Sequence, residues 1–482
     1  MSLWCAFATE RQNYVYDTSS NRILAVEPSV IGVLHGEQAH QAPGERCETD
    51  QAAREAVAAA RSEGLLRQLP YQIRSFPRDE MHGQIAGLLA HGPDQLVLNV
   101  TEACNLRCAY CTYSGAYPHH RSHSKRQMPT AVAHAAVTWY LNHPRRQQFT
   151  IGFYGGEPLL RLPLLRALVA QARASVGERV HFSVTTNGTL IDEDAARFLI
   201  EADFGLTISL DGPEAIHDRY RRTGDGRGTF GTVWRAVNLL RRLDERYFRE
   251  RVQFNVVLAP PVDLDALDAF FAAHPDIFRG SNVMTAPLNP QPSTVAGRLT
   301  GETDPSLAQA QRTQLWQHFE DDLAAGARER RALPWAQLSR DFVPLHQREM
   351  SSLPETIPTH GQCLPGARKC FVDTDGTFFM CERVAPAWPI GSVEEGFAVD
   401  RILAVVDAYD RFFAAHCGSC WAVRLCAKCV NSVRISDALD PTRRQAFCDN
   451  QRRYWRGLLT RYCGAREQRD DAFAWAQEVE IR

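Results

Sequence analysis

Two groups of cysteines are the residues whose type and spacing in this sequence best suit metal chemistry. The chain has 482 residues and 14 cysteines, of which three fall within residues 104–111 and eight within residues 363–448. Disulfides are rare in a reducing compartment, so clustered cysteines there are more often metal ligands or catalytic thiols. Cys5, Cys47 and Cys463 stand apart and are assigned no role.

The first group has the spacing Cys104-x3-Cys108-x2-Cys111, directly after an apolar, strand-like run. Three thiolates on one loop can ligate three irons of a [4Fe–4S] cube and leave the fourth iron without a protein ligand. An open iron indicates chemistry rather than simple electron carriage. Structural zinc is the alternative, but it favours four ligands in a closed tetrahedral site.

The second group has enough thiols for two complete [4Fe–4S] cubes with no open iron. The stretch GTFFMC (376–381) predicts a tight turn and a short strand that bring Cys381 back toward its neighbours. Two zinc sites are the alternative for this group. The eight residues are Cys363, Cys370, Cys381, Cys417, Cys420, Cys426, Cys429 and Cys448.

The elements that must position these cysteines begin at residue 95, where apolar strand-like runs alternate with amphipathic helical patterns. Such alternation predicts βα units and a parallel sheet. Six strands can form a partial (β/α)6 barrel of the TIM type, with function at the carboxyl ends of the strands. The fold class is therefore α/β. The predicted strands are 95–100, 149–154, 180–184, 205–210, 252–258 and 282–288.

Three loops at these strand ends carry residues suited to a small cofactor. Gly155-Gly156-Glu157-Pro158 follows the second strand, Thr186-Asn187-Gly188 ends the third, and Ser209-Leu210-Asp211-Gly212 ends the fourth. Glycines let the backbone approach a ligand closely, and the Glu157 carboxylate can pair with an ammonium group. The last two segments, read alone, are also ordinary strand-ending turns.

A strand followed by CxxxCxxC, with an aromatic residue before the last cysteine, resembles the signature of the radical SAM superfamily. The GGEP segment resembles the motif of that family that binds the methionine amino group. The resemblance implies that the first three cysteines hold a [4Fe–4S] cluster whose open iron chelates S-adenosylmethionine. A 5′-deoxyadenosyl radical then takes a hydrogen atom from the substrate. The implied cofactor contacts are Tyr110, Gly155, Gly156, Glu157, Pro158, Thr186, Asn187, Ser209 and Asp211.

The second cysteine group resembles the SPASM domain, which extends radical SAM peptide- and protein-modifying enzymes at their C-terminus. The resemblance implies two auxiliary [4Fe–4S] clusters, three clusters in all, with electron transfer as their simplest role and a structural role as the alternative. The Cys426-x2-Cys429 spacing is one residue shorter than the commonly quoted pattern, which bears on the assignment of Cys429. The implied ligands are Cys363, Cys370, Cys381 and Cys429 for the first, and Cys417, Cys420, Cys426 and Cys448 for the second.

Glu382 directly follows a predicted ligand, Cys381. In sulfatase-maturing relatives the residue in this place is an acid that acts as a base during substrate oxidation, and the resemblance implies this catalytic role for Glu382. A solvated surface acid is the alternative.

The resemblance divides the chain into a precursor-recognition domain (1–90), the radical SAM barrel (91–300), a helical bridge (301–358) and the SPASM domain (359–482). The first part has strand-like runs before a helical stretch, like the small winged-helix modules that bind the leader of a precursor peptide as an added strand. A packing extension is the alternative. Residues 77–93 are predicted to be a connector.

The predicted function is that of a radical SAM peptide maturase, which forms a thioether or carbon–carbon cross-link in a ribosomally synthesised precursor peptide. An electron donor such as flavodoxin or ferredoxin is implied. The net charge of −2, the lack of a ~20-residue apolar run and the lack of a secretory signal favour a cytoplasmic protein without nucleic-acid or membrane partners. The alternatives are a sulfatase-type maturase that oxidises Ser or Cys to formylglycine, and a non-catalytic iron–sulfur or zinc scaffold that binds peptides.

Overall fold

The largest element of the computed structural model is a ten-stranded mixed sheet in the order β10-β9-β8-β7-β6-β5-β12-β13-β14-β15. Neighbours from β10 to β5 pair in parallel. These six strands are β5 (Gln95–Thr101), β6 (Phe149–Gly155), β7 (Val180–Thr186), β8 (Gly205–Ser209), β9 (Val252–Leu258) and β10 (Val283–Pro287). The structure describes residues 3–39, 51–67, 72–74, 78–143, 146–278, 282–289, 292–299, 305–326, 332–358, 363–384 and 386–479.

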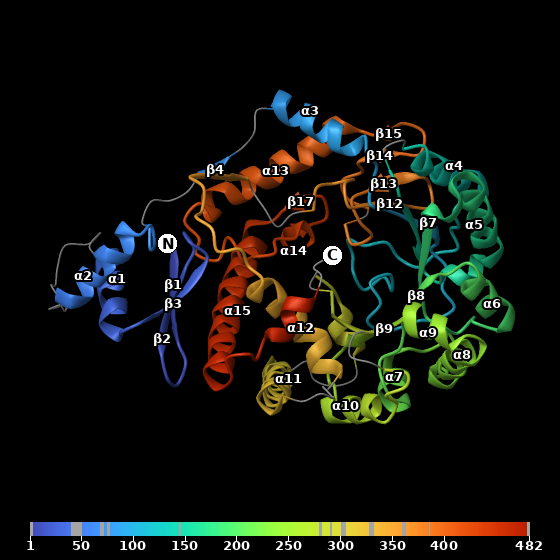
Figure 1. The fold of residues 1–482 in the computed structure, drawn as a ribbon. Helices are drawn as coiled ribbons and strands as arrows, with labels where there is room; N and C mark the ends of the chain where they lie inside the picture. The colour runs from blue at the N-terminus through green and yellow to red at the C-terminus, as the bar shows by residue number, and fades with distance from the viewer. Residues whose placement is uncertain are drawn as a thin grey trace.

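Helices follow the strands and line the outer side of the sheet, as Figure 1 shows for α4, α5, α6 and α8. In α8 the buried residues are Val233, Ala236, Val237 and Leu240, whose three- and four-residue spacing gives one apolar face toward the strands. The predicted α/β fold with six parallel strands is confirmed. The helices are α4 (Thr130–Leu141), α5 (Leu162–Val176), α6 (Glu193–Glu201), α7 (Glu214–Tyr220), α8 (Phe230–Leu243), α9 (Glu245–Arg251) and α10 (Leu264–Ala272).

The C-terminal region continues the barrel sheet instead of forming a separate layer. Strand β12 (Lys369–Val372) pairs in parallel with β5, with Cys370 opposite Leu96. The antiparallel strands β13 (Thr377–Phe379), β14 (Gly391–Ser392) and β15 (Gly396–Phe397) extend it further. The sequence predicted the turn and the short strand here, but not their union with the barrel.

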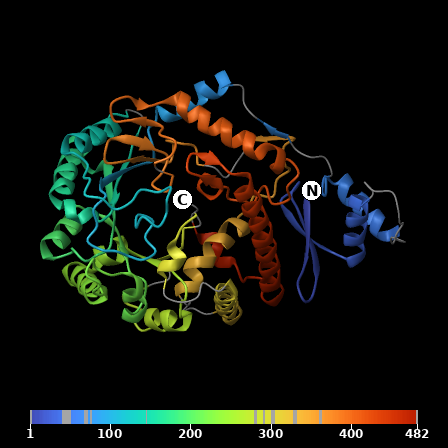
Figure 2. The same cartoon turned by 180° about the vertical axis from the view of Figure 1, so that it is seen from behind.

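The N-terminal part is a three-stranded antiparallel sheet followed by two helices. Because side chains alternate across a strand, Trp4 and Val15 pack with the helices on one face, while Phe7 and Tyr16 join the main core on the other. The Tyr14 hydroxyl also donates to Glu467 Oε1 at 2.8 Å. Figures 1 and 2 show this sheet beside α15 (Pro441–Gln468). The elements are β1 (Trp4–Ala8), β2 (Asn13–Asp17), β3 (Arg22–Val26), α1 (Pro28–Ala39) and α2 (Gln51–Ser62).

The predicted connector over 77–93 is wrong for most of its length, because residues Arg78–Leu89 form helix α3. Met81, Ile85 and Leu89 are buried at four-residue spacing and belong to the main core. The helix packs on α13 (Val399–Cys417). Two glycines within the segment and the prolines on either side of it disfavour a helix in the local sequence, but packing against the rest of the protein stabilises one.

The described part of the predicted helical bridge (301–358) contains two helices, α11 (Pro305–Ala325) and α12 (Ala332–His346). Among the described helices, none combines the length and the apolar character that crossing a membrane requires. The remaining elements are β4 (Gln72–Arg74), which pairs with β11 (Thr356–Pro358), α14 (Val430–Val433), and the β16 (Arg434–Ile435) and β17 (Ala438–Leu439) pair.

Candidate active site

A cavity of about 350 Å³ lies at the carboxyl ends of the parallel strands. The three cysteines of the first group, Glu382 beside Cys381 and residues of all three strand-end loops line it. The predicted site thus lies at the end of the sheet where parallel strands present their loops. The predicted residues that the structure brings together here are Cys104, Cys108, Tyr110, Cys111, Gly155, Gly156, Thr186, Asn187, Ser209 and Glu382.

The three-cysteine loop is held in place by backbone and side-chain contacts to its sulfur atoms. Cys104 Sγ accepts from Leu106 N at 3.4 Å, and Asn187 Nδ2 lies 3.8 Å from it. Cys111 Sγ accepts from Tyr113 N at 3.4 Å. Burial raises the pKa of the Cys104 thiol to about 11 and that of Cys111 to about 12. Three partly buried sulfurs on one loop match the donor chemistry of an iron–sulfur cluster, whose positive iron would stabilise the thiolates.

The GGEP glycines serve close packing of two loops. A Cβ on Gly156 would lie 2.1 Å from the Ala103 carbonyl oxygen, and one on Gly155 would lie 2.2 Å from the Thr101 oxygen. The backbone of the motif also bonds to the same segment, since Gly156 N donates to Thr101 O at 2.8 Å and Glu157 N to Ala103 O at 2.9 Å. Side chains larger than hydrogen at either glycine would therefore displace the segment that leads into Cys104.

Glu157 is fully buried and does not line the cavity. Its Oε1 accepts from Thr186 Oγ1 at 2.7 Å and from Leu159 N at 3.1 Å, and its Oε2 accepts from Asn187 N at 2.8 Å. Pro158, also buried, begins the short turn that follows. In this structure the carboxylate therefore joins the loops after β6 and β7, whereas the sequence predicted a bond to the cofactor's ammonium group.

The sequence reasoning missed Arg221, which reaches the cavity from the end of α7. Its Nε lies 2.9 Å from Asp211 Oδ2, and the two side chains are only 7% and 3% exposed. The Tyr110 hydroxyl donates to the same Asp211 oxygen, and the Arg221 guanidinium lies 5.4 Å from the centre of the Tyr110 ring. Asp211 thus acts on the site by positioning Arg221 and Tyr110, and does not line the cavity itself.

Buried His217 supports this arrangement and makes it sensitive to acid. Its Nδ1 accepts from Asp211 N at 3.3 Å, which leaves Nε2 to donate to Thr229 Oγ1 at 3.1 Å. Burial, reinforced by the charge of Arg221, lowers the pKa of His217 to about 4. The imidazole ring of His217 is therefore neutral in the folded protein near pH 7.

We expect acid to destabilise the protein through His217. As the pH falls below about 6.5, the His217 side chain binds a proton in the unfolded chain but stays neutral in the folded chain. The contribution of His217 to the free energy of unfolding is therefore fully present above pH 6.5 and is lost as the pH falls toward 4. The loss reaches about 3 kcal/mol, since each pKa unit corresponds to about 1.4 kcal/mol. Urea unfolding of the parent and His217→Asn, whose Oδ1 can still accept, checks this. If the free energy of unfolding depended on pH equally in the two proteins, the acid sensitivity could not be assigned to His217.

Glu382 reaches the cavity because the β12–β13 hairpin joins the barrel sheet. Its Oε2 lies 3.1 Å from Lys369 Nζ, and the side chains are 18% and 33% exposed. Arg121 Nη2 donates to the Glu382 carbonyl at 3.3 Å and to the Tyr113 hydroxyl at 2.7 Å. The carboxylate is thus held at the cavity wall, and is not the freely solvated surface acid of the alternative interpretation.

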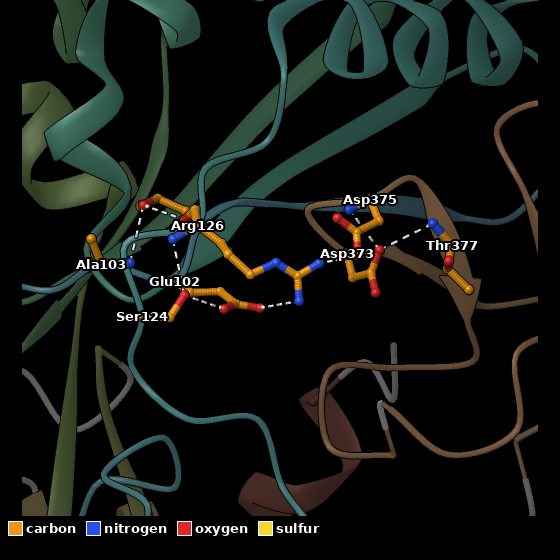
Figure 3. Close-up of polar contacts among 8 residues, drawn as sticks. Glu102, Ala103, Ser124, Arg126, Asp373, Asp375 and Thr377 are labelled. Atoms are coloured by element: carbon orange, nitrogen blue, oxygen red, sulfur yellow. Dashed lines mark hydrogen bonds and ion pairs between the residues drawn. The ribbon is translucent and has the colours of Figure 1, made fainter.

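The segment after the three-cysteine loop is tied to the same hairpin, as Figure 3 shows. Arg126 forms an ion pair with Asp375, and its Nη1 lies 3.9 Å from Glu102 Oε1. The Glu102 carboxylate also accepts from Ser124 Oγ at 2.6 Å, while Asp373 Oδ1 accepts from the backbone of the turn. These contacts fix the loop that carries Arg121 and so couple the two cysteine groups.

The second auxiliary set is gathered around the end of α13. Cys426 interacts electrostatically with Cys417, Cys420 and Cys448, the other members of the second implied ligand set. Burial raises the pKa of Cys426 to about 12 and raises that of Cys417, while the nearby Lys428 opposes both increases.

The first auxiliary set is more dispersed in the structure. Cys381 lies within electrostatic range of Cys429, while Cys370 is buried in β12 and Cys363 is exposed. Fully buried Arg434 acts on Cys381 and Cys429 electrostatically. Among the described residues, no three His, Cys, Asp or Glu side chains are close enough to hold one metal ion. Cys47 lies outside the described residues.

Residues 98–271, from β5 to α10, match the family model described as the Radical SAM superfamily. The chain contains a radical SAM domain. The predicted resemblance is thus confirmed for the part of the chain that carries the three-cysteine loop and the strand-end motifs.

Curated relatives match over about a third of this chain. A Serine-type anaerobic sulfatase-maturating enzyme of Bacteroides thetaiotaomicron is 30% identical over 150 residues, which are 30% of this chain and 36% of the relative. A Cysteine-type anaerobic sulfatase-maturating enzyme of Clostridium perfringens is 33% identical over 165 residues, which are 34% of this chain and 42% of the relative. The alignments thus span less than half of the relatives.

The fold extends the likeness beyond the radical SAM domain. The solved structure of native anSMEcpe with bound AdoMet and Kp18Cys peptide matches with a TM-score of 0.58 at 21% identity. The match covers 80% of this chain and 100% of that chain. The similarity therefore includes the overall fold, while about a fifth of this chain has no counterpart there.

Proposed function

We propose that this chain is a radical SAM maturase that installs a thioether or carbon–carbon cross-link in a ribosomally synthesised precursor peptide. The observation that carries the proposal is the single cavity in which the three-cysteine loop faces Glu382. A non-catalytic scaffold gains nothing from this juxtaposition, and the matched superfamily and the named relatives point to an enzyme.

In this proposal Cys104, Cys108 and Cys111 hold a [4Fe–4S] cluster, and the loops after β6, β7 and β8 hold S-adenosylmethionine. When bound, the two supply the 5′-deoxyadenosyl radical that removes a hydrogen atom from the peptide. The chain's own residues position the peptide, exclude water and accept the proton that leaves as the substrate is oxidised. Glu382 is the base, and Lys369 holds its carboxylate toward the cavity.

Loss of two hydrogens per event then balances as one hydrogen atom, one proton and one electron. The hydrogen atom goes to the 5′-deoxyadenosyl radical, the proton to Glu382 and the electron to the auxiliary clusters, while an electron donor such as flavodoxin or ferredoxin supplies the electron that starts the reaction. The interleaved cysteine sets, Cys363, Cys370, Cys381 and Cys429 and then Cys417, Cys420, Cys426 and Cys448, are proposed as the ligands of those two clusters.

The substrate proposal rests on the N-terminal sheet. We divide the chain into the precursor-recognition domain (1–90), the radical SAM barrel (91–300), the helical bridge (301–358) and the SPASM domain (359–482), and the sheet belongs to the first of these. Strand β3 has an outer edge that no other described strand covers. An uncovered edge can take a peptide as an added strand. Residues Arg22–Val26 would therefore bind the leader, while the core segment of the same peptide enters the cavity.

A sulfatase-type maturase that oxidises Ser or Cys to formylglycine is the second candidate. It is favoured by the named relatives and by the placement of Glu382 in the cavity. Both candidates use the same cavity and differ in the substrate and in whether the N-terminal sheet is needed.

Anaerobic co-expression with a short peptide encoded beside this gene, followed by intact and fragment mass spectrometry, tests the proposal. Loss of about 2 Da per event, placed on two linked residues, is expected. An unchanged peptide together with conversion of a sulfatase-derived Ser or Cys peptide to formylglycine would move the function to the second candidate.

Hydrogen exchange measured by mass spectrometry tests leader recognition without altering the chain. Adding a synthetic leader should slow exchange in residues 22–26, while residues 51–62 of α2 serve as the internal comparison. Exchange in 22–26 that is unaffected by a leader that still speeds modification would contradict strand addition at β3.

Glu382→Gln should reduce peptide modification by about 10²- to 10⁴-fold, the range for removal of a positioned base. Production of 5′-deoxyadenosine should continue, because the substitution leaves the three-cysteine loop intact. Glu394→Gln, an exposed glutamate of the same hairpin region, is the matched control and should keep full activity. Equal modification rates in the parent and Glu382→Gln would remove Glu382 from the mechanism.

A further inference from the structure

Lysine is used at only three positions in this chain, 125, 369 and 428, although Lys and Arg together number 54. Lys125 is exposed on the loop after the first cysteine group, and Lys369 is paired with Glu382. Lys428 differs from both, because it is only 3% exposed and stands between Cys426 and Cys429 in the sequence.

A buried lysine requires compensation of its charge, since an ammonium group is rarely taken fully out of water without a partner. Within the described residues the contacts of Lys428 Nζ are the Cys417 Sγ, at 3.8 Å, and the ring of Phe413, whose centre is 6.0 Å away. The polar partner of Lys428 is therefore sulfur. Its charge also acts on Cys426.

Compactness explains why lysine suits this position. An ammonium is a small point charge that fits beside one sulfur, whereas a guanidinium is a broad planar fork. The other fully buried cation of this region, Arg434, donates to the carbonyl oxygens of Ser436 and Arg383 and to the amide oxygen of Asn431. Of the two, Lys428 is the one whose cationic group contacts a cysteine sulfur, Cys417 Sγ, and this localises its effect to one set of thiols.

We propose that Lys428 is a positioning residue that raises the reduction potential of the second auxiliary cluster, held by Cys417, Cys420, Cys426 and Cys448. Reduction by one electron adds one negative charge to a four-iron cluster, and a fixed positive charge beside a ligand sulfur stabilises the reduced form. The cluster becomes the more favourable acceptor of the electron released in substrate oxidation. The inference rests on the cluster assignment in the proposed function.

The test is a potentiometric titration of the anaerobically prepared holoenzyme, followed by electron paramagnetic resonance, without peptide. Lys428→Met should lower the equilibrium constant for reduction of one cluster by about tenfold or more, which is about 59 mV for one electron. The signals of the other two clusters should not move. Lys428→Arg, which keeps the charge on a broader group, should shift the potential less than Lys428→Met does, and Lys125→Met is the exposed control.

Iron and sulfide analysis of each variant separates the possible failures. Loss of the cluster from Lys428→Met but not from Lys428→Arg would overturn the inference, because it would show that the charge retains the cluster instead of tuning its potential. Three clusters with the same potentials in the parent and in Lys428→Met would overturn it and leave the proposed function intact. A parent with no auxiliary cluster at these cysteines would overturn both this inference and the cluster assignment.

Discussion

Replacement of Cys104 with alanine is expected to abolish cleavage of S-adenosylmethionine and, with it, peptide modification. The loss should be at least about 10³-fold, because enzymes accelerate their reactions by about 10⁶-fold or more and the proposed radical chemistry starts at this cysteine loop. Cys104 is one of three sulfurs on the loop, and its Sγ is already oriented by Leu106 N and Asn187 Nδ2. Two sulfurs cannot hold the cluster as three do.

The measurement is 5′-deoxyadenosine production by the reduced protein, together with iron content, which should fall by about one third if three clusters are present. Cys463→Ala is the matched control, since Cys463 is buried on α15 outside both cysteine groups. It should lose some stability and keep its iron and activity. Undiminished 5′-deoxyadenosine production by Cys104→Ala would rule out the radical SAM site proposed here.

Arg221→Met should lower the free energy of unfolding by about 3–5 kcal/mol, the usual effect of removing one partner from a buried ion pair. The substitution leaves the Asp211 carboxylate buried, with the Tyr110 hydroxyl and Val257 N as its remaining donors. Because Tyr110 also lines the cavity, binding of S-adenosylmethionine should weaken as well.

Denaturant unfolding of matched variants checks this expectation. Arg251→Met removes an exposed partner of Asp203, where the side chains are 42% and 48% exposed, and should cost about 1 kcal/mol or less. The double variant Arg221→Met with Asp211→Leu should recover part of the loss, since no buried charge is left unpaired. If Arg221→Met and Arg251→Met lowered the free energy of unfolding by similar amounts, the buried ion pair would contribute no more to stability than the exposed one.

Local sequence determined much of the barrel. All six strand-like runs form the parallel strands, and the helical patterns between them form helices. Each segment buries apolar side chains, and their spacing in the sequence differs between a helix and a strand, so the pattern can be recognised from sequence. The three-cysteine loop and the strand-end motifs meet at one cavity because parallel strands end at the same edge. Helix α3 was missed because its two glycines and the flanking prolines obscure an apolar face that packs on α13 and the main core.

The tertiary structure alone decided how distant segments complete the site. Pairing of β12 with β5 carries Glu382 to a cavity whose other walls lie far earlier in the chain, and backbone pairing of that kind leaves no periodic trace in sequence. Burial of Lys428 beside Cys417 and of Arg221 beside Asp211 likewise depends on what surrounds each side chain. Spacing along the chain identifies which groups can do chemistry, while their partners, charges and exposure arise only from packing between segments far apart in sequence.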